Sequence, residues 1–129
     1  MEYTFPFEKL EVWQLSRKLN YNINDILKQF PAEERFNLTN QIRRAATSVA
    51  LNLAEGTSRV SFKEQARFSE VAFASLIEVY CALILAKDLG YLTDETFQSV
   101  APQIREISNK INSLRNHQLS RVNSETNLQ

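Results

Sequence analysis

The residues of this chain that could do chemistry are few and widely separated. There is one histidine, His117, and one cysteine, Cys81, so neither a Cys-His pair nor a zinc cluster is expected within one subunit. The carboxylate pairs Glu33-Glu34 and Asp94-Glu95 fall at expected helix starts, where the helix dipole favours acidic side chains. The Glu-x-x-His motif of di-metal bundles and Gly-rich phosphate loops do not occur. We therefore expect no enzyme activity, no cofactor and no metal.

The basic residues are more informative by placement than by number. Fifteen Lys and Arg residues balance fifteen Asp and Glu residues, which removes the global attraction to polyanions of a strongly basic nucleic-acid-binding domain. Local clusters remain, and an oligomer that repeats them could hold phosphates. The same side chains could equally form a solvated helix surface with one structural ion pair. The candidates for RNA or DNA contacts are Arg43, Arg59, Lys63 and Arg67.

Composition predicts one all-α domain over residues 1–129. The chain is 43% apolar, enough for one core but marginal for two, and it has only two glycines and three prolines to break helices. Cys81 lies in the apolar run VAFASLIEVYCALILA and is expected to be a small buried hydrophobe without an internal disulfide. Glu78 interrupts that run, which is too short for a membrane span. The start MEYTFPFEKLEVW does not read as a secretory signal, so we expect a cytoplasmic protein without membrane contacts.

Apolar residues recur at steps of three and four in four segments, which predicts helices over about 7–30, 38–55, 61–89 and 94–118. Gly56 and Gly90 are expected to end the second and third helices, and Ser61 with Glu64 to form a capping box. Residues 119–129 form a polar tail that is expected to fray. Short connections between the helices predict an antiparallel up-down four-helix bundle.

The third helix is apolar on nearly every side between residues 69 and 89. A bundle helix needs only one apolar arc, so its outer side must be covered as well. We therefore expect a homo-oligomer in which this helix makes subunit contacts, with Leu10 and Trp13 as candidate companions because aromatic residues are enriched in interfaces. The alternative is that the C-terminal tail folds back over this face.

The second helix has a polar ridge of Gln41, Ser48, Asn52 and Glu55 beside a low surface of small side chains. A close helix contact there would require partners for its polar groups, because an unpaired buried one costs roughly 1–3 kcal/mol. Glu78, on the third helix, needs such a partner too. We expect Arg44 or another arginine to pair with Glu78 or Glu55.

Several motifs resemble one bacterial protein family. They are FEKLEVWQLSRKL, QIRRAATSVALNLAEGTSR, FKEQARFSEVAFASLIEV and LAKDLGYL. These stretches are similar to the four-helix-bundle proteins encoded by intervening sequences in large-subunit ribosomal RNA genes, whose fold is like that of the accessory protein of diversity-generating retroelements. The resemblance covers about residues 7–119.

The resemblance implies a four-helix bundle assembled as a homopentameric ring, without described catalytic residues. In the retroelement branch it implies binding of nucleic acid and a reverse transcriptase through basic surface. The positions that match the family motifs, with structural or functional roles left open, are Gln41, Arg43, Arg44, Asn52, Glu55, Gly56, Ser75 and Glu78.

Three functions follow for testing. The first is a non-enzymatic homo-oligomeric scaffold that contacts itself, with another protein, RNA or DNA as candidate further partners. The second is a nucleic-acid-binding accessory protein. The third is an enzyme built between subunits, with His117 or Glu55 donated across the interface.

Overall fold

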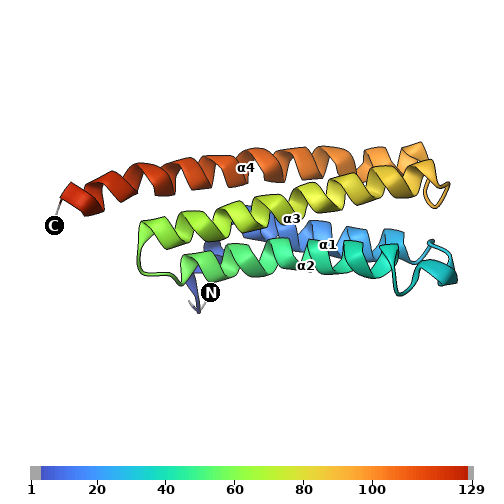
Figure 1. Cartoon of the computed structure of the whole chain (residues 1–129), viewed down its shortest axis with the longest axis horizontal. Coiled ribbons are helices and arrows are strands. Elements are labelled where there is room, and N and C mark those ends of the chain that lie inside the picture. Colours follow the sequence, from blue (N-terminus) through green and yellow to red (C-terminus); the bar gives the residue numbers. More distant parts are fainter. Residues whose placement is uncertain (1–3, 128–129) are drawn as a thin grey trace.

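The computed structural model describes residues 4–127, and within that range it is an all-α, antiparallel four-helix bundle (Figure 1), as the sequence predicts. A short 3₁₀ helix, Pro6–Lys9 (η1), precedes α1, and a second one, Ala32–Glu34 (η2), precedes α2. The four long helices are α1 (Glu11–Leu27), α2 (Leu38–Thr57), α3 (Phe62–Asp88) and α4 (Asp94–Asn127).

The helices form the four edges of a square bundle. Contacts join α1 to α2, α2 to α3, α3 to α4 and α4 to α1, whereas no Cα atoms of the described residues in the diagonal pairs lie within 8 Å of each other. Each of α2 and α3 therefore has two neighbours and one outward face. The seam between α1 and α4 is held by polar groups: Asn22 Nδ2 donates to Gln103 Oε1 at 3.0 Å, and Lys110 pairs with Glu11.

One hydrophobic core runs along the bundle axis. On α1, the apolar stripe of Val12, Leu19, Ile23 and Ile26 is buried, and Leu15 on the same stripe packs at the edge of the core. On α3, the inward positions Ala72, Leu76, Val79 and Leu83 are completely buried, because their spacing of three and four keeps them on one face. The inward residues of α4 continue this core as Phe97, Val100, Ile104, Ile107 and Ile111.

Gly56 does not end α2 in a left-handed turn, so that prediction is wrong. It is buried inside the helix, where an added Cβ would lie 3.2 Å from Phe68 Cβ on α3. The glycine therefore permits close approach of the two helices. The helix ends instead at Thr57, because the hydroxyls of Thr57 and Ser58 donate to the carbonyls of Ala54 and Glu55, both at 2.7 Å. Gly90, with φ of 81°, follows α3 as predicted.

The polar tail predicted to fray is helical as far as Asn127, while residues 128–129 lie outside the described residues. α4 continues because α3 offers it partners beyond His117. Ser69 Oγ donates to Gln118 Oε1 at 2.7 Å, and both side chains are buried. The Arg121 guanidinium lies 5.2 Å from the centre of the Phe62 ring. As far as Asn127, the tail thus extends α4 along its own axis (Figure 1) and does not cover α3's outer face.

The start of α3 shows one half of its predicted capping box, because the Glu64 carboxylate pairs with Arg67 and not with the Ser61 backbone. Ser61 precedes the helix, and its hydroxyl accepts a hydrogen bond from the Glu64 backbone N–H at 3.1 Å. Cys81 differs from its prediction because it is exposed. It lies on the outward side of α3, since a residue two positions after the buried Val79 is turned about 200° from it.

Candidate functional site

The outward face of α3 is an apolar strip without a cover inside the subunit. Ile77 and Leu85 keep 48% and 51% of their surfaces exposed. By length and composition, α3 is the one helix among the described residues that could cross a membrane, yet 39% of that stretch is buried in the bundle. The apolar residues of α3 therefore lie both on its inward side, in the core, and on its outward side, at the surface. We call Val71, Ala74, Ile77, Cys81 and Leu85 the α3 outer stripe.

One acidic side chain lies in the middle of this stripe. Glu78 is exposed, seven residues from Val71 and seven from Leu85, and it makes no hydrogen bond or ion pair with any described residue. The carboxylate is therefore free to meet a cation from outside the subunit.

The outward face of α2 is hollowed. A hollow of about 380 Å³ at the α2–α3 seam adjoins one of about 470 Å³ further along α2, and the two share Arg44 and Ser48. We call their lining on α2 the α2 outer face. It consists of Gln41, Arg43, Arg44, Ala45, Thr47, Ser48, Leu51, Asn52 and Glu55.

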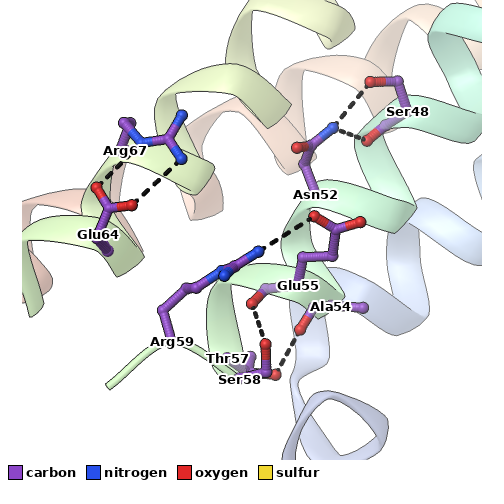
Figure 2. A network of polar contacts seen from close by, with 9 residues as sticks. All are labelled: Ser48, Asn52, Ala54, Glu55, Thr57, Ser58, Arg59, Glu64 and Arg67. Carbon is purple, nitrogen blue, oxygen red and sulfur yellow. Dashed lines mark hydrogen bonds and ion pairs between the residues drawn. The ribbon is translucent and has the colours of Figure 1, made fainter. Parts of the chain in front are cut away.

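Small polar side chains hold α2 and α3 together beneath these hollows. Ser48 Oγ and Ser75 Oγ are 2.8 Å apart. Asn52 Nδ2 donates to the Ser48 carbonyl and to Ser48 Oγ, both at 2.9 Å (Figure 2). Of the predicted polar ridge, Ser48 meets Ser75 and accepts hydrogen bonds from Asn52, whereas Gln41 and Glu55 are exposed. Sequence reasoning noted both serines without connecting them, because the register of α2 against α3 cannot be read from either helix alone.

Arg44 does not form the predicted ion pair. It is exposed and lines the same hollow as Glu78, but neither Glu78 nor Glu55 lies within 4 Å of its guanidinium. Glu55 reaches Arg59 instead, at 3.9 Å, and both of these side chains are about half exposed (Figure 2). The expected Arg44 pair is absent because Arg44 lies on the outward arc of α2, where solvent satisfies it and no burial demands a partner. The alternative, that another arginine pairs with Glu55, is confirmed by Arg59.

A family model for the 23S rRNA-intervening sequence protein matches residues 8–113. The chain belongs to this family. The match confirms the family resemblance, while the relation to retroelement accessory proteins stays a prediction. A crystal structure of a protein of unknown function from the S23 ribosomal protein family of Bacteroides thetaiotaomicron is similar, with a TM-score of 0.60 and 22% identity over 86% of this chain and 97% of that one. This likeness shows the shared fold. None of the curated proteins compared matches the chain.

Three of the candidate nucleic-acid residues of this family member gather at one end of the bundle. Arg59 and Arg67 place their guanidinium groups 4.5 and 4.6 Å from the centre of the Phe68 ring, and Lys63 lies on the first turn of α3 between them in sequence. Arg67 also donates to both carboxylate oxygens of Glu64, at 3.0 and 3.2 Å (Figure 2).

Local acids partly neutralise this basic corner. The hydrogen bond from Arg67 and the nearby positive charges hold the pKa of Glu64 below its ordinary value, and the same pair raises the pKa of Arg67. Both side chains are exposed enough for solvent to weaken the pair.

Arg43 is separated from the basic corner. Its Nε donates to Asn24 Oδ1 on α1 at 3.0 Å. It precedes Arg59 by sixteen residues, which corresponds to about 24 Å along a helix axis. The structure therefore joins Arg59, Lys63 and Arg67 and leaves Arg43 apart.

Leu10 and Trp13 pack at the edge of the core, each half-buried. The Phe7 ring meets the Trp13 indole edge-on with centroids 4.8 Å apart, and Arg17 lies 5.7 Å from that indole. Phe7 thus covers part of the surface that the sequence left open, and an interface role for Leu10 and Trp13 stays a prediction.

The groups that could react are scattered across the described residues. No three His, Cys, Asp or Glu side chains there are arranged to hold a metal ion. His117 is exposed on α4, and Cys81 lies on the α3 outer stripe. The most organised feature of the surface is therefore the pair formed by the α3 outer stripe and the α2 outer face.

Proposed function

We propose that this protein is a non-enzymatic, cytoplasmic homo-oligomer, with five subunits favoured, that serves as a scaffold or interaction protein. The observation that carries the proposal is the α3 outer stripe. Ile77 and Leu85 are each about half exposed, and burying the rest would contribute roughly 1 kcal/mol apiece. Repeated along the stripe, this contribution favours association with an apolar or small-residue surface.

The number five rests on the family resemblance. In a closed ring every subunit has the same environment. Each copy carries one α3 outer stripe, and ring closure leaves none of these stripes uncovered. Other faces of the bundle would remain free for a second protein or a nucleic acid.

Light scattering coupled to size-exclusion chromatography tests the proposal. We expect a single species several times heavier than the chain, whose mass is stable over a hundredfold dilution. A monodisperse monomer at every concentration would contradict it.

A second candidate function is binding of RNA or DNA by the basic corner. The observation that favours it is the gathering of Arg59, Lys63 and Arg67 at one end of the bundle, with Arg121 from α4 close to Phe62 on the same helix turn as Lys63. A ring would repeat this cluster once per subunit, and each phosphate contact steepens the salt dependence of binding.

A salt titration of binding to a structured RNA tests the second function. Binding should weaken steeply with salt, and the slope should flatten when Arg59, Lys63 and Arg67 are all replaced by Gln. The matched control is Arg105→Gln, an exposed α4 position away from the corner. No binding at low salt excludes this function and leaves the scaffold proposal untouched.

A further inference from the structure

The register of α2 against α3 sets which residues lie at the same height along the bundle. Ser48 meets Ser75, and eight residues on, Gly56 approaches Phe68. Because the helices are antiparallel, each step back along α2 is matched by a step forward along α3. Arg44, four residues before Ser48, therefore lies level with the position four residues after Ser75, which is next to Glu78. One residue corresponds to about 1.5 Å of height.

The same register aligns the rest of the two outward surfaces. Leu51, three residues after Ser48, lies within one residue of the height of Val71. Glu55, seven residues after Ser48, lies within one residue of the height of Arg67. Arg44, Leu51 and Glu55 of α2 thus lie level with Glu78, Val71 and Arg67 of α3, which matches a cation with an anion, two apolar residues, and an anion with a cation. The exposed Glu70 lies beside Val71 on α3.

A rotation about an axis parallel to the bundle preserves these heights. If a second copy is related to the first by such a rotation, its α3 outer stripe meets the α2 outer face with every residue at its own level. Glu78 of one copy then lies opposite Arg44 of the next, and the apolar stripe covers Leu51 and the small side chains around it. Within one subunit Arg44 and Glu78 line the same hollow without forming an ion pair, and neither pairs with another described residue.

Pairing of α3 with α3 is unfavourable by comparison. A two-fold axis through the centre of the outer stripe brings the two Glu78 side chains together, because Glu78 lies midway between Val71 and Leu85. Like charges placed together in an interface cost several kcal/mol. The stripe therefore needs a surface with a cation at its middle, and the α2 outer face supplies Arg44.

The directions of the two surfaces fit a small ring. Outward faces of adjacent helices in a square bundle point about 90° apart. A closed ring requires about 90° between its two contact faces for four copies, about 108° for five and about 120° for six. A head-to-tail contact between these faces therefore closes after few subunits and cannot extend into a straight filament.

We propose that the α3 outer stripe of one copy docks on the α2 outer face of the next, with Glu78 opposite Arg44, in a head-to-tail contact that closes into a ring. This inference rests on the proposed homo-oligomer and names its two surfaces and its partner, a second copy of the chain. It also explains why Arg44 and Glu78 are exposed and unpaired within one subunit.

Charge reversal with mixing tests the contact. Arg44→Glu and Glu78→Arg each place like charges in every interface, and each should raise the concentration needed for assembly about 100-fold or more. Mixing equal amounts of the two variants restores opposite charges wherever two different chains meet, so native mass spectrometry should show mixed assemblies. In a ring of five, these hold the two chains in a 3:2 or 2:3 ratio, with one like-charged contact left. An interaction confined to one subunit cannot be rescued by mixing.

The control is Arg105→Glu, which makes the same charge change on the outward side of α4 and should leave the mass of the assembly unchanged. Circular dichroism checks that each variant folds. If wild type assembles but either reversal leaves its mass unchanged, or the mixture stays dissociated, the proposed contact is wrong while the oligomer stands. If wild type itself is a monomer, the proposed function fails first.

Discussion

The buried hydrogen bond between Ser69 and Gln118 gives the sharpest stability test of the extended α4. The two side chains are 2% and 5% exposed, and the hydroxyl donates to the amide oxygen at 2.7 Å. Ser69→Ala removes the donor and leaves the buried oxygen of Gln118 without a partner. That loss should cost about 1–3 kcal/mol of the free energy of unfolding.

Removing the other partner should cost less. In Gln118→Leu the Ser69 hydroxyl can turn to the carbonyl of Gln65, four residues back on its own helix. We expect a loss of at most about 1 kcal/mol, and the double variant should be more stable than the sum of the single costs predicts, because it leaves no polar group unpaired.

Urea unfolding of the four proteins, at one fixed protein concentration because assembly adds to stability, measures these energies. The reasoning is refuted if Ser69→Ala unfolds at the wild-type midpoint, or if the two single losses simply add. Either result would mean that the turn of α4 after His117 does not pack against α3 as described.

Two further predictions concern the glycines and a tyrosine. Gly56→Ala should stay within about 1 kcal/mol of wild type, because the gain in helix propensity offsets a small shift of Phe68, whereas Gly56→Leu should lose about 2 kcal/mol or more by overpacking. Gly90→Ala should lose about 1–2 kcal/mol of stability from its left-handed backbone alone, since nothing lies within 4 Å of an added Cβ. Thermal melts compare the three glycine variants with wild type, and an unchanged melting temperature in Gly90→Ala contradicts the backbone argument. Burial and the neighbouring Glu34 carboxylate raise the pKa of Tyr91 above 10.0. The stability contributed by its neutral phenol is therefore fully present below that pH and falls as the pH rises through the folded pKa. We expect wild type to lose stability at alkaline pH, and Tyr91→Phe to lose less.

Helix number and fold class could be predicted from sequence because apolar residues at steps of three and four report directly on which face is buried. The stripe of α1 and the inward residues of α4 show this. Helix ends were less predictable. In the sequence, Gly56 looks like the residue that ends a helix. Only the structure shows that Phe68 of α3 lies close to it, so that Gly56 is needed for helix packing.

Part of the candidate site could likewise be predicted from the sequence, and part could not. The excess apolar surface of α3 is visible in the sequence, because a bundle core cannot cover a helix on all sides. The exposure of Cys81 and the absence of a partner for Arg44 depend on how α2 and α3 are rotated, which a single sequence does not specify. The level placement of Arg44 and Glu78 likewise depends on the Ser48–Ser75 register.

The mass of the assembled protein in solution tests the central claim most directly. Sedimentation velocity of wild type should give one species near five times the chain mass of 14.9 kDa, and Ile77→Glu, which places a charge in the α3 outer stripe, should give a folded monomer. A wild-type protein that sediments as a monomer, or an assembly indifferent to Ile77→Glu, would contradict the account.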